Sequence, residues 1–314
     1  MSLSERLLRR LRASVPDVVV LVDTVLGVYA ALWEGRTPFA IVAWEHFNLS
    51  VNHGSRLRTA GRVWAAWRAD ALVVLTERDA HAWREHRWHP CSARVIPNPT
   101  SMKPSVTTPK VEASPHVVLA LGRLEHEKGY DRLMRAWSLL GSKRNGWLLR
   151  IVGEGSERQA LSALAAELGV SDSVCLPGAI RDVAVAYESA SIFAMTSRWE
   201  GLPMTLIEAQ SFGLPAVAMD CETGPREILS GGGGILVADG DETAMARELH
   251  RLMCDGAARV TLAREAQLAS GRFSPAIVTA EWLHLLESIS PRPSGWQGSQ
   301  YVDLVSRATP RHST

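Results

Sequence analysis

The chain has 314 residues, which is enough for two domains of ordinary size. It is 46% hydrophobic and 21% charged, as globular proteins usually are, and its formal net charge of +1 leaves no basic stripe for a nucleic-acid partner. Four single, widely spaced cysteines predict neither a zinc site nor a disulfide framework, and they fit a reducing cytoplasm. No apolar run reaches the ~18 residues of a membrane span, and the N-terminus lacks the apolar core of a signal peptide.

The first hundred residues alternate between helical patterns and short apolar runs. Residues 4–13 form a basic helix whose leucines are expected to pack on the following sheet, and the alternative is that this helix lies on an anionic membrane. Continuous apolar runs are typical of buried parallel strands, so the alternation predicts a parallel α/β sheet. The expected strands are 18–22, 39–43, 71–75 and 93–96, and the expected helices are 24–33, 56–68 and 77–86.

A segment rich in Pro, Ser and Thr at 101–115 is expected to link two domains. The alternation then restarts, which predicts a second doubly wound domain over 116–290, and the polar tail 291–314 is expected to be loose. The expected strands are 116–121, 147–152, 173–176, 191–195, 216–219 and 235–237. The expected helices are 129–140, 156–168, 183–189, 205–212, 225–229, 242–254, 257–269 and 275–288.

The most informative stretch is 197–215, which follows an apolar strand. A tight loop carries Glu200, Pro203 has the φ suited to a first helical position, and the next helix carries Glu208 and ends at Gly213. The free amides at that helix start form a site for a phosphate or a sugar oxygen. The Glu200 carboxylate therefore lies before those amides, and the Glu208 carboxylate lies about one and a half turns further along the helix.

A second motif, 122–129, lies where a strand ends and a helix begins. Open α/β sheets bind ligands at this edge. Arg123 offers a fork of donors and Lys128 a compact charge, so both can reach one diphosphate. A cation at a helix N-terminus opposes the helix dipole, which favours an anionic ligand there.

Three further patterns are weaker. The turn 153–155 begins with Gly153 but lacks the third glycine of a dinucleotide-binding fingerprint, so a plain βα turn explains it as well. Asp239 and Asp241 have the spacing of a metal-binding pair, but Asp241 is expected to cap a helix instead. His46 follows a strand, and a neutral imidazole there can be either structural or a hydrogen-bond partner near a reacting centre.

These motifs together resemble the group 1 (family 4-type) retaining glycosyltransferases of the GT-B fold. The matching segments are Glu200 to Ala209, Gly122 to Leu133, the turn at 153–155, 176–180 and 220–228. The resemblance implies two Rossmann-like doubly wound α/β domains. It also implies an enzyme that moves a hexose from a nucleotide diphosphate sugar, with a UDP-sugar favoured, to an acceptor hydroxyl. Because Arg123 and Lys128 supply positive charge, neither a metal nor a cofactor is expected. The excess of arginine over lysine favours a bacterial source with a GC-rich genome.

The resemblance also assigns roles to residues. Arg123 and Lys128 are expected to neutralise the leaving diphosphate, Glu200 to hold hydroxyls of the donor sugar, and Glu208 to hold the ribose. Glu45 and His46 are expected to project into the cleft, where His46 lines the opposite wall. The other donor-binding residues implied are Gly122, Gly153, Ile180, Gly201, Leu202, Pro203, Met204 and Thr205.

The resemblance begins near residue 16, in the middle of the family's first domain, so the N-terminal domain is expected to be incomplete. The acceptor stays open between a polysaccharide, a lipid-linked sugar and a small natural product. An inactive nucleotide-sugar-binding subunit and a GT-B sugar-nucleotide epimerase are the alternatives. The expected location is the cytoplasm, with contact at the inner face of the membrane as a further option.

Overall fold

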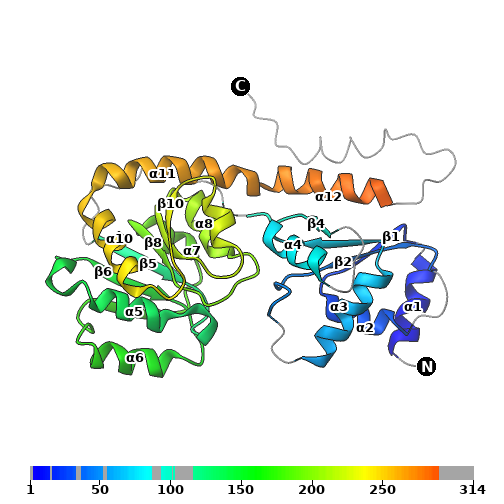
Figure 1. The fold of residues 1–314 in the computed structure, drawn as a ribbon, viewed down its shortest axis with the longest axis horizontal. Coiled ribbons are helices and arrows are strands. Elements are labelled where there is room, and N and C mark those ends of the chain that lie inside the picture. The colour runs from blue at the N-terminus through cyan, green and yellow to red at the C-terminus, as the bar shows by residue number, and fades with distance from the viewer. Residues whose placement is uncertain are drawn as a thin grey trace.

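The computed structural model describes residues 3–14, 16–32, 37–51, 55–86, 93–100, 102 and 116–289. It contains two parallel sheets, each with helices packed against it, and the two sheets lie side by side (Figure 1). The expected α/β fold with two Rossmann-like domains is confirmed. Most of the expected linker and the whole expected tail lie outside the described residues.

The first sheet has four strands in the order β1-β2-β3-β4. Helices α3 and α4 cover one face, where Ala65, Trp83 and Leu72 are buried together. Helix α1 packs Leu8 and Leu11 against a neighbouring apolar cluster, as its sequence pattern predicts. The elements are α1 (Leu3–Ser14), β1 (Val18–Leu21), η1 (Thr24–Leu26), α2 (Gly27–Ala30), β2 (Ala40–Trp44), α3 (Arg56–Arg68), β3 (Ala71–Val74), α4 (Glu77–Glu85) and β4 (Ala93–Val95).

The second sheet has six strands in the order β10-β9-β8-β5-β6-β7. The chain runs outward from β5 through β6 to β7, and then returns to place β8 on the other side of β5. Its first elements are β5 (Val117–Leu121), η2 (His126–Lys128), α5 (Tyr130–Ser138), η3 (Gly141–Arg144), β6 (Leu148–Val152), α6 (Arg158–Glu167), β7 (Val174–Gly178) and α7 (Val183–Glu188). They are followed by β8 (Ile192–Met195), α8 (Met204–Ser211), β9 (Ala216–Met219), α9 (Pro225–Leu229), β10 (Gly234–Val237) and α10 (Glu242–Cys254).

Alternate residues of the second sheet face opposite layers of helices. One core cluster joins the strands to α5, α6 and α10, with Trp137 fully buried. The other joins them to α7, α8 and α9, with Tyr187 and Phe193 at its centre. Burial on both faces explains why these strands read as continuous apolar runs.

The C-terminal arm connects the two domains. Helix α11 (Gly256–Ser270) packs beside α8, and after η4 (Gly271–Phe273) the chain continues into α12 (Pro275–Ile289), which lies along the first sheet (Figure 1). Val278 and Leu285 of α12 are buried against Val42 and Val73 of that sheet. The assignment of 116–290 to one domain stays a prediction, and α12 belongs by its packing to the first sheet.

Two local predictions were wrong. The expected helix at 24–33 is a 3-10 turn followed by the single helical turn of α2, and Trp33 lies outside the described residues. The Thr24 hydroxyl donates to Glu45, 2.7 Å away, which ties the turn to the neighbouring strand end. Pro203 precedes α8 as its N-cap instead of forming its first residue.

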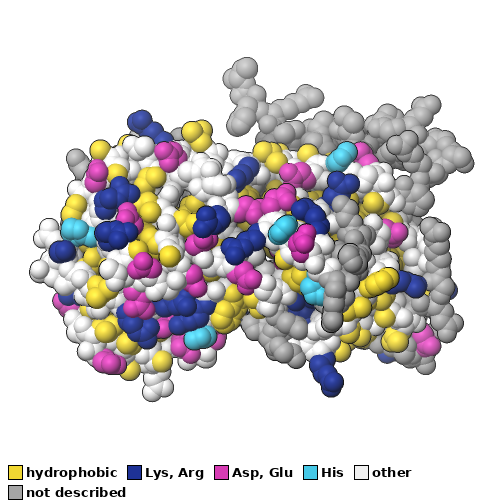
Figure 2. Space-filling model, viewed as in Figure 1, with side chains coloured by type: hydrophobic (Ala, Val, Ile, Leu, Met, Phe, Trp, Pro, Cys, Tyr) yellow, Lys and Arg dark blue, Asp and Glu magenta, His cyan; other side chains and the backbone are white. Residues whose placement is uncertain are grey.

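Other local predictions were confirmed. Asp241 caps α10 by accepting a hydrogen bond from the Ala244 amide at 2.7 Å. Gly213 follows α8 with a φ of +69°, a conformation that favours glycine. Within the described part of the chain, the structure contains no helix of the length and apolarity that crossing a membrane demands. On the face drawn in Figure 2, basic and acidic side chains are intermixed.

Candidate active site

Three strand-to-helix turns meet at the carboxyl edge of the second sheet. The Gly122 amide donates to Val152 O and the Gly153 amide donates to Gly178 O, each at 3.0 Å. Gly153 has a φ of +147°, and a Cβ built on it would lie 1.8 Å from Gly122 O. A side chain at Gly153 would therefore push the turns apart. Gly122, Gly153 and the segment leading to the half-buried Ile180 form one continuous wall.

The crevice between β5 and β8 brings Lys128 to Glu200. These strands are neighbours although the chain visits two others between them, and ligands of open α/β sheets bind at such a switch point. Lys128 Nζ donates to Glu200 Oε1 at 2.7 Å, and Ser197 Oγ donates to the same oxygen at 2.7 Å. The side chains of Lys128 and Glu200 are 19% and 11% exposed, so the pair is largely shielded from water.

Arg198 fixes the two loops that carry this pair. Its amide donates to Glu127 O at 2.7 Å, and its guanidinium donates to His126 O at 2.8 Å. The same guanidinium holds both oxygens of Asp131 in a bidentate pair. The loop before α5 therefore keeps its position relative to the loop before α8.

Arg123 lies at the rim. Its side chain is 71% exposed and forms an ion pair with Glu127. The structure thus brings Lys128 and Glu200 into contact, and it leaves Arg123 at the solvent edge of the same crevice.

The start of α8 supplies open amides, and Glu208 stands one turn along the helix. Among the described side chains none caps the N-terminus of α8, so the amides of Met204 and Thr205 have no side-chain acceptor there. Tyr187 Oη donates to Glu208 Oε2 at 2.7 Å. Burial raises the pKa of the Glu208 carboxyl, and the Tyr187 hydrogen bond opposes that rise.

The sequence did not single out Tyr187. Its ring is buried in the core of the second domain with its hydroxyl at the edge, and such a tyrosine looks like an ordinary core aromatic in a helical pattern. Leu202 and Pro203, by contrast, are buried residues of the loop that was expected to contact the donor.

His46 lies across the crevice, at the end of β2. Its half-buried ring packs on Trp44, with ring centroids 4.3 Å apart. Burial lowers the pKa of the imidazole, and the nearby carboxylates of Glu45 and Asp23 partly oppose this effect. The lowered pKa favours the neutral imidazole at His46. A Cβ on Gly201 would lie 2.2 Å from His46 O, so the two domains touch here main chain to main chain.

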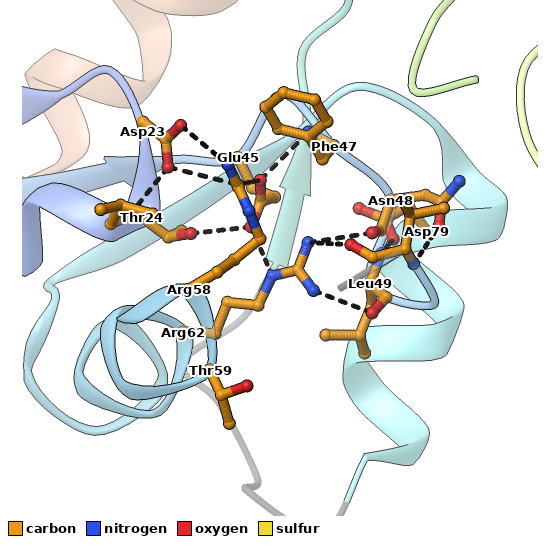
Figure 3. Close-up of polar contacts among 12 residues, drawn as sticks. Asp23, Thr24, Glu45, Phe47, Asn48, Leu49, Arg58, Thr59, Arg62 and Asp79 are labelled. Atoms are coloured by element: carbon orange, nitrogen blue, oxygen red, sulfur yellow. Dashed lines mark hydrogen bonds and ion pairs between the residues drawn. The ribbon is translucent and has the colours of Figure 1, made fainter. Parts of the chain in front are cut away.

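Glu45 does not project into the crevice, and that expectation was wrong. Its side chain is fully buried inside the first domain (Figure 3). Arg62 Nε donates to Glu45 Oε2 at 2.7 Å, and Arg58 Nη1 lies 3.3 Å from Oε1. A buried carboxylate needs such partners, because an unpaired buried charge is costly. Glu45 thus anchors the loop that carries His46.

Polar contacts join the domains around this point. Asn48 Nδ2 donates to Glu200 O at 2.7 Å. On the other side, the Glu227 carboxylate accepts from the Glu77 amide at 2.9 and 3.1 Å, at the start of α4. A narrow pocket, too small to hold a water molecule, lies at this contact between the domains. Its lining residues are Glu45, His46, Phe47, Asn48, Leu75, Thr76, Asp79 and Gly201.

The two aspartates with metal-like spacing have other partners. Asp239 pairs with Arg132 at 2.8 Å and Asp241 caps α10. In the part of the chain that the structure describes, no three His, Cys, Asp or Glu side chains gather as a metal site would require.

Comparison with known proteins identifies the family. A model of the family described as "Glycosyl transferases group 1" matches residues 108–269. The chain belongs to the group 1 glycosyltransferases. The match contains Lys128, Glu200 and Glu208, so the crevice between β5 and β8 lies in the family's defining region.

Individual glycosyltransferases extend the similarity into the first domain. An uncharacterized glycosyltransferase of Haemophilus influenzae is 30% identical over 271 residues, which are 86% of this chain and 76% of that protein. A lipopolysaccharide 1,6-galactosyltransferase of Salmonella typhimurium is 29% identical over 71% of this chain and 61% of its own.

Solved structures agree on the fold. The apo form of the lipopolysaccharide outer core galactosyltransferase WaaB superposes with a TM-score of 0.72 at 25% identity, covering 91% of this chain and 79% of that one. HepE of Anabaena in complex with UDP superposes with a TM-score of 0.80 at 21% identity, covering 91% and 82%. The protein is a GT-B glycosyltransferase in architecture.

Proposed function

We propose that this glycosyltransferase moves a hexose from a UDP-sugar to an acceptor hydroxyl with retention of configuration. The observation that carries the proposal is the contact between Lys128 and Glu200 at the switch point of the second sheet. A cation beside a carboxylate suits the boundary between a diphosphate and a sugar, since each group is complementary to one part of the donor. The UDP and UDP-glucose complexes of HepE support this choice of donor.

Each charged group has one role in the proposal. Lys128, with Arg123 at the rim, neutralises charge on the departing diphosphate, which stabilises the transition state without a metal ion. Glu200 and the amides at the start of α8 hold hydroxyls of the sugar. Glu208, oriented by Tyr187, accepts hydrogen bonds from the ribose hydroxyls.

The proposed reaction takes place on one face of the sugar. The bond between the anomeric carbon and the β-phosphate oxygen breaks while the acceptor oxygen bonds to the same carbon from the same side. The acceptor proton passes to the departing phosphate, so no protein nucleophile is needed. Neutral His46 donates or accepts a hydrogen bond at the sugar from the opposite wall.

The proposed acceptor is a saccharide hydroxyl of an envelope glycan, reached from the cytoplasmic side of the membrane. Names of relatives support this class: one acts on lipopolysaccharide and another on a diNAcBac-PP-undecaprenol glycan. Helix α1 supports contact with the membrane surface, since Leu8 and Leu11 pack inward while its arginines stay exposed. An exposed cationic face is attracted to anionic lipids.

Glu200→Gln tests the proposed site. We expect kcat for hexose transfer to fall by about 10²-fold, because the amide replaces the carboxylate that pairs with Lys128 and holds the sugar. The measurement is UDP release from UDP-glucose and UDP-galactose with saccharide acceptors.

The matched control is Glu248→Gln, which removes a carboxylate held by Arg247 and Arg251 on α10, outside the crevice. We expect it to retain wild-type turnover. Full transfer activity in Glu200→Gln would exclude Glu200 as the sugar-holding group.

A further inference from the structure

Asn48 connects the first domain to the main chain of Glu200. Its Nδ2 donates to Glu200 O at 2.7 Å and lies 3.1 Å from Thr223 Oγ1. The Thr223 hydroxyl also donates to Glu200 O. Asn48 and Thr223 are 2% and 4% exposed, so water does not compete for these hydrogen bonds. One carbonyl oxygen is thus held from both domains at once.

Hydrogen bonds within the first domain hold the loop that carries Asn48 (Figure 3). Arg62, itself 1% exposed, donates to Asn48 O and to Leu49 O, each at 2.9 Å. Asn48 Oδ1 accepts from the Val51 amide at 2.9 Å. The guanidinium of Arg62 is neutralised by Glu45, so the loop is tied to the buried core of the first domain. Asn48 therefore cannot follow Glu200 if the two domains separate.

The position of the Glu200 side chain depends on the loop that carries Asn48. Its Oε1 is held by Lys128 and Ser197, both from the second domain, whereas its carbonyl is held by Asn48 from the first. The adjoining Gly201 has no room for a Cβ beside His46 O. The position of the Glu200 carboxylate is therefore determined by the contact between the domains as well as by its own domain.

We infer that Asn48 is a positioning residue that sets Glu200 from the opposite domain, so that the sugar-holding carboxylate is in place when the two domains meet. This inference rests on the proposed role of Glu200 in holding the donor sugar. The inference distinguishes two events. The nucleotide binds to groups of the second domain, and the sugar becomes correctly oriented through Asn48 of the first domain.

Asn48→Ala tests this inference in the full-length protein. We expect kcat for transfer to fall about tenfold or more, since small displacements of positioned groups are costly in rate. The Kd for UDP, measured by calorimetry, should change less than about threefold, because Lys128 and Glu208 stay in place. Amides of 197–205 should exchange hydrogen faster in Asn48→Ala, as measured by mass spectrometry without any ligand.

Gln210→Ala is the matched control, because Gln210 is a buried amide that donates to Gly232 O, 3.0 Å away, within the second domain. It should lower Tm without accelerating exchange at 197–205. Thr223→Val, which removes the other donor to Glu200 O, should act less than additively with Asn48→Ala.

The outcomes distinguish the inference from the proposed function. Unchanged exchange at 197–205 together with unchanged kcat, or equal effects of Gln210→Ala and Asn48→Ala, would overturn the role of Asn48. If the wild-type protein binds no UDP and transfers no hexose, the proposed function fails, and the hydrogen exchange of 197–205 still decides whether Asn48 positions Glu200.

Discussion

At the scale of single residues, the two carboxylates of the Glu200–Glu208 block have different surroundings. Glu200 pairs with the Lys128 cation, whereas Glu208 accepts a hydrogen bond from the neutral hydroxyl of Tyr187. The sequence placed Lys128 and Glu200 each after an expected strand, and the family resemblance grouped them with Glu208 around one donor. The sequence could not predict Asn48 as a partner of Glu200, because residues 152 positions apart are brought together by domain packing.

Asp79 provides a pH-dependent prediction at this scale. Burial raises the pKa of its carboxyl to about 7, opposed mainly by the hydrogen bond from the Leu49 amide. The folded state therefore holds a proton on Asp79 that the unfolded state releases at lower pH. The stability from this proton is fully present below about pH 4, and it is lost as pH rises through about 7.

The test is Asp79→Asn, whose amide oxygen can still accept from the Leu49 amide. We expect the free energy of unfolding of the wild type, measured by urea titration, to decline from pH 5 to pH 8 by a few kcal/mol relative to Asp79→Asn, since one pKa unit corresponds to about 1.4 kcal/mol. Parallel pH profiles of the two proteins would show that Asp79 is charged in the fold at all these pH values.

At the scale of elements, the alternation of strands and helices was predictable, and the short segment between β1 and β2 was harder. Strand β9 and helices α3, α9 and α10 have the bounds that their patterns predicted. The segment 24–33 failed because tertiary contacts decide its shape: a Cβ on Gly61 would lie 2.2 Å from Thr24 O, so α3 and the turn pack main chain to main chain. Local periodicity contains no information about such an approach.

The loop between β8 and α8 gives a prediction at this scale. A Cβ on Gly201 would lie 2.2 Å from His46 O, which is main chain and cannot rotate away. Gly201→Ala should therefore displace the loop and lower kcat for transfer by about tenfold or more. The measurement is steady-state transfer with a UDP-hexose donor.

Gly271→Ala is the control for Gly201→Ala, since a Cβ at Gly271 meets nothing within 4 Å and its φ is −56°. We expect Gly271→Ala to match the wild type in both kcat and Tm. Equal activity of Gly201→Ala and the wild type would mean that the contact with His46 is absent during turnover.

At the scale of the whole molecule, one C-terminal arm contacts both halves of the site. Helix α11 packs beside α8, which carries Glu208, and α12 packs on the first sheet, where Trp282 meets Trp44 with ring centroids 4.8 Å apart (Figure 1). The sequence predicted a helix at 275–288 but could not say which sheet it covers, because the apolar face of either sheet would bury its hydrophobic side chains.

The contact between the domains is partly polar where the site lies. Asn48 donates to Glu200 O, and the Glu227 carboxylate accepts from the Glu77 amide at the start of α4, while Leu75 of the first domain is buried in an apolar cluster of the second. Polar contacts of this kind between domains allow relative motion, because the groups regain water when the domains part. The arrangement agrees with a donor that binds to the second domain and is completed by the first.

The most direct measurement is the thermal unfolding of the purified protein with UDP and UDP-hexoses, compared with the adenosine and guanosine diphosphates. At about 100 times its Kd a ligand adds about 2.7 kcal/mol, which for domains of this size raises Tm by several degrees. We predict such a rise with a uridine nucleotide and its loss in Lys128→Ala. No rise with any nucleotide, or an equal rise in Lys128→Ala, would contradict a nucleotide-sugar site between β5 and β8.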